Sequence, residues 1–245
     1  MSVNLKFMQL PYFYEPFISS INTVMTLGED TSRHCVQVLR MKAGGKLQLT
    51  DGKGNIYTAT IINADKKHCG VRIEETNYKE NQNTRKVCIA ISLLKNMSRF
   101  EWFLEKAVEI GVQQIIPLLC ERTEKQHYKM DRLQNIVVSA MLQSQQVWLP
   151  LLHQPTTFSE VINNSNLFNQ KFIAHCIDDN RKITMNTISI LDKTQILIGP
   201  EGDFTEKEIA LALEHHYQPV SLGNTRLRTE TAGVVASALL VHSPQ

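Results

Sequence analysis

The sequence predicts an α/β protein built from a small β domain and a larger domain with a mostly parallel sheet. Three observations predict this fold class. Short runs that alternate apolar and polar residues fill the front of the chain, near-continuous apolar runs alternate with helical patterns behind it, and a polar stretch separates the two. We therefore expect a β domain over residues 1–74, a linker over 75–84 and an α/β domain over 85–245.

The composition is that of an ordinary folded protein. Of the 245 residues, 42% are hydrophobic and 20% are charged, and the net charge of +2 excludes a histone-like polycation. The five cysteines never form a C-x-x-C pair, which argues against a zinc ribbon, a redox motif or a disulfide framework and favours a reducing cytoplasm. No secretion signal or membrane-spanning run is apparent, so we expect neither export nor a membrane partner.

The front domain is expected to be a small meander or barrel. Leu47 and Leu49 alternate with polar neighbours, and the alternation returns over residues 57–61 and 71–73. The segment DGKGN at 51–55 supplies turn residues between the first two runs. A calcium loop is the rival interpretation of that segment, but a lysine stands at a ligand position and the closing glutamate is missing, so a hairpin turn is favoured.

Positive charge gathers in the front domain. Residues 28–72 hold eight Lys and Arg against four Asp and Glu, which predicts salt-dependent attraction to phosphate. The rival interpretation is ordinary barrel surface, and an aromatic base-stacking platform is not apparent. The candidate RNA-binding residues are Arg33, His34, Arg40, Lys42, Lys66 and Lys67. Arg122 and Lys125, further along the chain, are weaker candidates for which a solvated loop is the safer interpretation.

The α/β pattern begins with an apolar run at 87–94 of the kind that a doubly covered parallel strand shows. Residues 98–110, with Trp102 and Phe103 among the apolar positions, have helical spacing and end at Gly111. A second strand is expected at 115–119. The remaining expected elements are a helix carrying Leu133, Ile136, Val137, Ala140 and Met141, and strands at 171–177, 195–198 and 219–222.

Three segments near the carboxyl end carry the candidate chemistry. The motifs of P-loop NTPases, dinucleotide-binding proteins, zinc proteases and serine hydrolases are absent. Instead, a strand runs into Gly-Pro-Glu-Gly at 199–202, where Thr205 and Glu208 form a capping box for the following helix. A second strand ends at Gly223, and residues 227–233 open a last helix. Each segment alone reads as a capped loop, but loops at the carboxyl edge of such a sheet bind ligands.

Together these segments resemble a known family. ILIGPEGDFTEKE, SLGNTRLRTETA and LLKNMSRFEWFLEKAVEIGVQQIIPLLCERT are similar, in order and spacing, to segments of the RsmE family of 16S ribosomal RNA uridine-N3 methyltransferases, which belongs to the SPOUT superfamily. The resemblance covers nearly the whole chain. It implies a trefoil-knotted parallel sheet with helices on both faces, a PUA-like RNA-binding barrel in front, and a homodimer. Around residues 140–150 the sequence departs from the family, with Leu142 and Gln146 where charged residues are common.

The resemblance also implies S-adenosylmethionine (SAM) as cofactor and 16S rRNA of the 30S subunit as partner, with no metal. Three loops would bind SAM. The cofactor-binding residues it implies are Ile198, Gly199, Pro200, Glu201, Gly202, Ser221, Leu222, Gly223, Leu227, Thr229 and Ala232.

Arg228 is the candidate cation for the charge that develops on uracil, or for gripping the target phosphate. Glu230 would accept a proton or hold Arg228; the rival interpretation is that it only complements the positive end of the last helix. Two other functions stay open at this point: an assembly factor that binds RNA without catalysis, and a methyltransferase of the same fold that acts on tRNA ribose.

Overall fold

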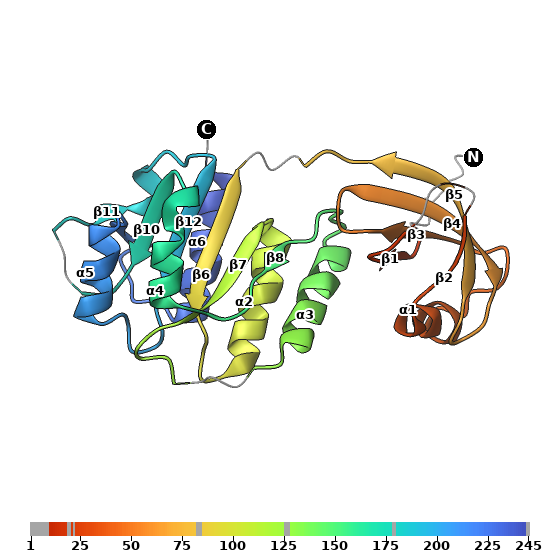
Figure 1. Cartoon of the computed structure of the whole chain (residues 1–245), viewed down its shortest axis with the longest axis horizontal. Coiled ribbons are helices and arrows are strands. Elements are labelled where there is room, and N and C mark those ends of the chain that lie inside the picture. The colour runs from red at the N-terminus through yellow and green to blue at the C-terminus, as the bar shows by residue number, and fades with distance from the viewer. Residues whose placement is uncertain are drawn as a thin grey trace, which may run out of the picture. The chain divides into compact units, whose positions relative to one another are not determined.

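The computed structural model describes residues 10–18, 21, 23–81, 85–124, 128–177 and 180–243. The chain divides into two compact units (Figure 1). The first unit holds Met1–Asn81 and Ser144–Leu149, and the second holds Gln82–Gln143 and Pro150–Gln245. Residues 82–84 of the expected linker and the RNA candidate Lys125 lie outside the described residues.

The first unit is a five-stranded sheet in the order β1-β3-β4-β5-β2. Its apolar face forms the core, because the alternating residues of β3, β4 and β5 are buried as the sequence predicts. β1 runs parallel to β3, and the other neighbours are antiparallel. The elements are β1 (Tyr12–Tyr14), β2 (Val24–Thr26), α1 (Glu29–Arg33), the π-helical turn η1 (His34–Val38), β3 (Lys46–Thr50), β4 (Asn55–Asn63) and β5 (Gly70–Tyr78).

The strand β5 is longer than its sequence suggests. It continues through residues 75–78, which we expected to lie in the linker, and pairs there with 55–58 of β4. The side chains of these residues are polar, but one face of an antiparallel sheet tolerates water, so the backbone ladder extends regardless of polarity.

Residues 144–149 belong to the first unit, although we expected them in the 85–245 domain. Leu149 N donates to Gly52 O at 2.8 Å, and the indole Nε1 of Trp148 donates to Lys79 O at 3.0 Å. Gly54 has a φ of +94°, and a Cβ there would lie 2.6 Å from Trp148 Cζ2. Residues 144–149 therefore pack against the turn at 51–55.

Hydrogen bonds of Asp51 close the same turn. Its Oδ1 accepts from Lys53 N at 2.8 Å and from Asn55 N at 3.3 Å, and its Oδ2 accepts from Asn55 Nδ2 at 2.7 Å. This is the pattern of an aspartate that stabilises its own turn. Because β3 and β4 pair antiparallel on either side of it, this segment is a hairpin turn, as predicted.

The second unit is built on a parallel sheet in the order β11-β13-β10-β12-β6-β7-β8, with β9 also pairing with β7. Its central strands β6 and β12 are buried almost throughout, as expected for a sheet covered on both faces. The strands are β6 (Lys86–Ser92), β7 (Gln114–Leu119), β8 (Leu151–Leu152), β9 (Thr156–Thr157), β10 (Gln170–Ala174), β11 (Ile183–Thr184), β12 (Lys193–Ile198) and β13 (Gln218–Ser221).

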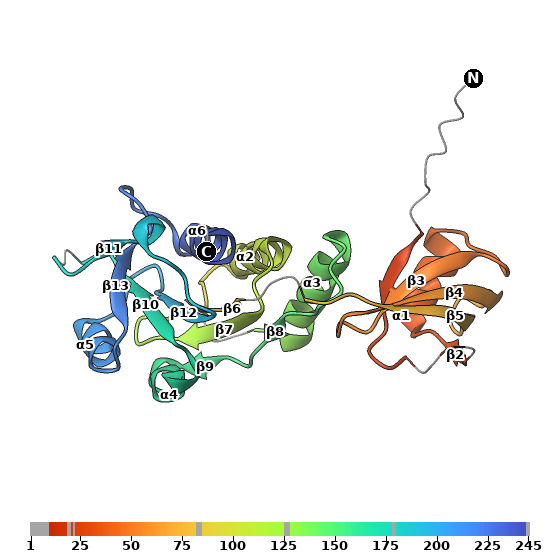
Figure 2. The ribbon, with the colours of Figure 1, turned by 90° about the horizontal axis from the view of Figure 1, so that it is seen from above.

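Helices cover both faces of this sheet (Figure 2). On one side lie α2 (Met97–Ile110), α3 (Met130–Gln143) and α6 (Thr229–His242), and on the other lie α4 (Phe158–Asn163) and α5 (Glu206–Glu214). The unit also contains the 3₁₀ turns η2 (Ser165–Leu167) and η3 (Met185–Thr187). Gly111 ends α2 in the left-handed conformation, as predicted. Trp102 is 44% exposed, however, because the buried stripe of α2 runs through Phe100, Phe103 and Ala107.

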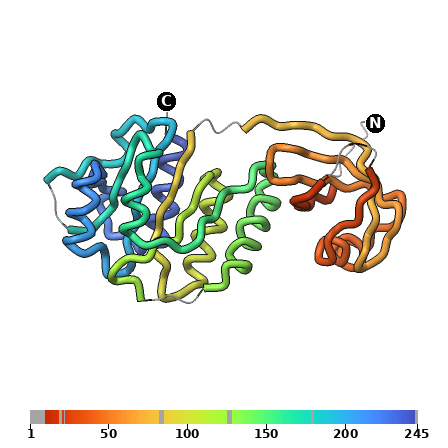
Figure 3. Tube along the Cα trace, viewed as in Figure 1, coloured from red at the N-terminus to blue at the C-terminus, as the bar shows by residue number. Residues whose placement is uncertain are grey.

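The last helix returns to the start of the second unit, where α6 packs against α2 and β6 (Figure 3). Gly233 makes this approach possible, because a Cβ there would lie 2.6 Å from Ile91 Cδ1 and from the Phe103 ring. The trefoil knot stays a prediction. None of the described helices has the length and apolarity needed to cross a membrane.

Candidate active site

A pocket of about 410 Å³ lies in the second unit where three loops meet. The loops follow β10, follow β12 and precede α6. Because parallel strands place their carboxyl ends at one edge, these loops converge there although they are far apart in the sequence. Eight of the predicted site residues line the pocket: Ile198, Gly199, Pro200, Glu201, Leu227, Arg228, Thr229 and Ala232.

The loop after β12 is held from several sides. Asp203 has a φ of +63°, and its Oδ2 accepts from the backbone N of Cys176 at 2.7 Å, which ties this loop to the one after β10. Arg122 Nη1 donates to Gly202 O at 2.8 Å. Arg122, a weak RNA candidate from the sequence, therefore organises the loop.

Two further contacts fix the ends of this loop. The predicted capping box is present: the Thr205 side chain accepts from Glu208 N, and the Glu208 carboxylate accepts from Thr205 N at 2.8 Å. Gly199 packs against the buried ring of Phe204, where a Cβ would lie 3.1 Å from Cδ2. These contacts fix the backbone at 199–205, and a side chain at Gly199 would crowd Phe204.

The loop before α6 brings two guanidinium groups to the pocket, those of Arg226 and Arg228. Both residues are exposed, and Arg228 is the N-cap residue of α6 with extended backbone. Thr229, the next residue, is buried. The pocket lining therefore combines apolar residues with exposed positive charge, and it also includes Glu201 and Asp203.

Glu230 does not line the pocket. It lies buried in the first turn of α6, and its Oε1 is 3.7 Å from Nε of Arg99 on α2. An acidic side chain at this position also complements the positive end of the helix, which was the rival interpretation. Since Arg99 itself lines the pocket, Glu230 reaches the site through Arg99 and makes no described contact with Arg228.

Four predicted cofactor residues are also absent from the pocket lining: Gly202, Ser221, Leu222 and Gly223. Ser221 Oγ donates to Gly223 O at 2.9 Å, so this segment closes its own turn after β13. Gly202 lies beside the Arg122 side chain.

Sequence reasoning missed five residues that line the pocket: Arg99, Ala174, Cys176, Asp203 and Arg226. The first lies on α2, within a segment that carried the family resemblance. Ala174 is the last residue of β10, and Cys176 follows that strand. The sequence predicts a strand there, and parallel strands of one sheet end at the same edge, so these two residues could have been predicted to line the site.

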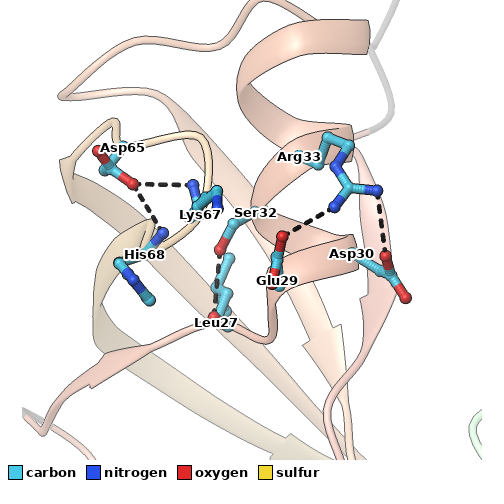
Figure 4. A network of polar contacts seen from close by, with 8 residues as sticks. All are labelled: Leu27, Glu29, Asp30, Ser32, Arg33, Asp65, Lys67 and His68. Atoms are coloured by element: carbon cyan, nitrogen blue, oxygen red, sulfur yellow. Dashed lines mark hydrogen bonds and ion pairs between the residues drawn. The ribbon is translucent and has the colours of Figure 1, made fainter.

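The six main RNA-binding candidates, Arg33 to Lys67, all lie in the first unit, whereas the weaker candidate Arg122 lies in the second. Arg33 is compensated within its own helix, because its guanidinium forms ion pairs with Glu29 at 2.9 Å and Asp30 at 3.5 Å (Figure 4). Asp65 Oδ1 accepts from the backbone N of Lys67 at 2.8 Å and shapes the turn between β4 and β5.

Ser32 joins these two elements. Its Oγ donates to Leu27 O and accepts from Cys69 N at 3.0 Å, so α1 and the β4–β5 turn form one surface. His34 stacks edge-on against Phe13, with ring centroids 5.5 Å apart. Within the described part of the chain, no salt bridge uses the remaining exposed cations Arg40, Lys42, Lys66 and Lys67.

The described residues contain no group of three or more His, Cys, Asp or Glu side chains that could hold a metal ion. The cysteines are unpaired thiols, four buried and one, Cys176, exposed.

Comparison with known proteins decides which family this architecture represents. An RNA methyltransferase domain model matches residues 80–241, and an RNA methyltransferase PUA domain model matches residues 27–74. Ribosomal RNA small subunit methyltransferase E of Synechocystis sp. is 31% identical over 89% of this chain and 73% of its own length. The chain belongs to the ribosomal RNA small subunit methyltransferase E family.

Solved structures of the ribosomal RNA small subunit methyltransferase E family and similar proteins share the whole architecture. The enzyme from Neisseria gonorrhoeae, determined bound to S-adenosyl methionine, is 31% identical with a TM-score of 0.84, covering 94% of this chain and 96% of that one. A probable rRNA-methyltransferase from Porphyromonas gingivalis is 38% identical with a TM-score of 0.84, covering 93% and 95%. The predicted α/β domain with a parallel sheet and a PUA-like domain in front is thereby confirmed.

Proposed function

We propose that this protein transfers the methyl group of SAM to N3 of a specific uridine in 16S rRNA of the small ribosomal subunit. One observation carries the proposal: most residues of the Gly-Pro-Glu-Gly and Leu-Arg-Thr-Glu-Thr-Ala segments, on which the family resemblance rests, line a single pocket at the carboxyl edge of the sheet. The relative from N. gonorrhoeae binds SAM and carries the name of a small-subunit rRNA methyltransferase, which supports the same cofactor and substrate here.

The pocket fits the cofactor. Its volume of about 410 Å³ falls within the range of small-molecule sites. Ile198, Leu227 and Ala232 provide apolar surface for the adenine ring, while the backbone of 198–201 and 227–229 offers N–H and C=O groups to its polar edge. Bound there, SAM supplies an electrophilic methyl group on a sulfonium.

Positioning is the main task of the residues around the methyl group, because an in-line displacement needs alignment more than covalent help. Uracil N3 must lose its proton, and the negative charge then spreads over O2 and O4. Arg228 is exposed and lines the pocket, which supports a role in facing that charge or the phosphate of the target nucleotide.

The first unit would supply RNA affinity. The exposed Arg40, Lys42, Lys66 and Lys67 form no described ion pair, so they offer full positive charges to phosphates. Arg33 and His34 are exposed on the same unit, but the charge of Arg33 is compensated by Glu29 and Asp30.

The working assembly is a homodimer in the cytoplasm, where small subunits reside. Apolar side chains of α6 that stay half-buried in this chain, Val234, Val235 and Leu239, support a partner surface. Sedimentation of the purified protein at micromolar concentration tests this part separately.

The function is tested by incubating the protein with labelled SAM and 30S subunits from a strain that lacks this enzyme, followed by nucleoside analysis of the RNA. We expect label in 3-methyluridine. Label in a 2′-O-methylated nucleoside would favour a ribose methyltransferase. SAM binding absent in calorimetry, with RNA binding intact, would favour an assembly factor.

A further inference from the structure

A second hollow of about 590 Å³ adjoins the proposed SAM pocket at the start of α2. It is lined by Lys95, Asn96, Met97, Arg99, Glu124 and Glu201. Arg99 and Glu201 also line the first pocket, so these two side chains stand at the boundary between the two spaces.

The boundary is where methyl transfer has to occur. In an in-line displacement the acceptor nitrogen approaches the methyl carbon from the side opposite the sulfur, so donor and acceptor occupy adjoining spaces. Side chains that line both spaces are therefore the ones that can touch the reacting atoms.

We propose that the second hollow holds the acceptor uracil, with Glu201 taking the N3 proton and Arg99 facing the charge on the uracil oxygens. This inference rests on the proposed function and adds to it the place of the base and the identity of the proton acceptor. It also moves Glu201 from cofactor binding, where the sequence put it, to acid–base chemistry.

The charges of the hollow suit a neutral base. The ammonium of Lys95 is engaged by Glu124, with Nζ 2.8 Å from Oε2, which leaves two charged groups for a ligand: the Glu201 carboxylate and the partly exposed Arg99 guanidinium, whose Nε faces Glu230. Such a pair matches a ring that presents an N–H donor between two carbonyl acceptors. A phosphate would instead require an excess of positive charge.

Glu201 is held in place but remains accessible. Its Oε1 accepts from the backbone N of Lys95 at 3.3 Å, and the residue is exposed. The neighbouring start of α2 is fixed by Asn96, whose side chain accepts from Ser98 N at 3.0 Å. The carboxylate therefore has a defined position and a free edge toward the hollow.

Glu230 is the other carboxylate near the site, and its geometry argues against a role as the base. Its side chain is only 9% exposed, it lines neither space, and it faces Arg99. Glu230 is thus a positioning residue that orients the Arg99 guanidinium.

The proposed step balances. The N3–H proton passes to the Glu201 carboxylate, and the electron pair left on N3 forms the new N–C bond. The C–S bond breaks, and its pair stays on sulfur, so that the sulfonium becomes a neutral thioether. No oxidant, reductant or metal is needed.

The test compares Glu201→Gln with the wild-type protein in 3-methyluridine formation on 30S subunits, across pH. Removal of a general base typically costs about 10²- to 10⁴-fold in rate, so we expect a loss of at least about 100-fold near neutral pH. The residual rate should rise with pH as uracil ionises without help, and Glu201→Asp should regain part of the loss. Calorimetric SAM affinity should stay within about threefold.

A matched control is Glu206→Gln, the same chemical change at an exposed residue of α5 outside both spaces, which should leave the rate unchanged. The inference is overturned by near-normal turnover of Glu201→Gln, by a pH profile parallel to that of the wild-type protein, or by an equal loss of SAM binding. Absence of 3-methyluridine with the wild-type protein would instead overturn the proposed function itself, so the two failures are distinguishable.

Discussion

The guanidinium of Arg99 on α2 faces the carboxylate of Glu230 on α6, with Nε 3.7 Å from Oε1. The Glu230 side chain is 9% exposed and that of Arg99 is 40% exposed. The buried carboxylate therefore relies on the ion pair to compensate for lost hydration, whereas the guanidinium can still be hydrated. The pair joins two helices that pack against each other and places one cation at the pocket. This contact therefore links the packing of α2 and α6 to the proposed site.

Replacing Arg99 by alanine should reduce the free energy of unfolding. A buried charged group left without its partner costs about 1–3 kcal/mol, and the exposure of Arg99 puts our expectation at the lower end, about 1 kcal/mol. Urea denaturation followed by circular dichroism measures it. The double variant Arg99→Ala/Glu230→Gln should recover part of the loss, and strictly additive single effects would contradict the coupling.

Replacing Arg228 by alanine should abolish turnover while leaving SAM binding largely intact, because this exposed residue is proposed to face the acceptor. Removing one electrostatic stabiliser typically costs about 10²- to 10³-fold in kcat. Calorimetry with SAM and methyl transfer to 30S subunits give the two readouts. A loss of SAM affinity of the same size would place Arg228 in the cofactor pocket instead.

Replacing Gly233 by alanine should destabilise the second unit. The new Cβ would lie 2.6 Å from Ile91 Cδ1 and from Phe103 Cε2, both in buried residues, and overpacking of this kind costs roughly 1–3 kcal/mol. Gly202→Ala is the matched control, because a Cβ there would lie 3.5 Å from its nearest neighbour, Arg122 Cδ, which is an ordinary contact. Equal unfolding midpoints for the two variants would show that α6 can shift freely.

Reversing the charge of Lys66 and Lys67 should weaken RNA binding more than Arg33→Gln does. Neither lysine has a described ion pair, whereas Arg33 is already compensated by Glu29 and Asp30. Binding to 16S rRNA fragments, measured over a range of salt concentrations, should show a shallower salt slope for the double lysine variant. Indistinguishable slopes for all three proteins would remove the β4–β5 turn from the RNA-binding surface.

Alkylation of the native protein should modify Cys176 well before the other thiols. Burial raises the pKa of Cys35 and of Cys88 from 9.0 to about 12, so both stay protonated and unreactive near neutral pH. Cys176 is exposed and lines the pocket, so SAM should slow its labelling, as peptide mass analysis can show. Early labelling of Cys88 would contradict the burial of β6.

The same pKa values predict how the free energy of unfolding changes at alkaline pH. In the unfolded chain the Cys35 and Cys88 thiols ionise near pH 9, whereas in the folded protein they do not ionise until about pH 12. Ionisation therefore favours unfolding, and their contribution to stability is present below pH 9 and falls as the pH rises toward 12. Serine at both positions should flatten this part of the profile.

Much of the architecture follows from the sequence alone. Alternation at Leu47 and Leu49 and the apolar runs of β6 and β12 determine strands because burial requires those periods, and the Thr205–Glu208 pair determines where α5 begins. The Gly-Pro-Glu-Gly and Leu-Arg-Thr-Glu-Thr-Ala segments indicate the position of the pocket, because the loops that follow parallel strands lie at the same, carboxyl edge of the sheet.

Only the tertiary structure decided which side chains meet. Three contacts join residues that are far apart in the chain: the ion pair of Glu230 with Arg99, the hydrogen bond from Cys176 N to Asp203 in the loop after β12, and the packing of Trp148 against Gly54. Local periodicity reports which face of an element is buried, but it holds no information on the partner that buries it. That partner depends on strand order and helix packing, which bring the pocket residues together only in the folded second unit.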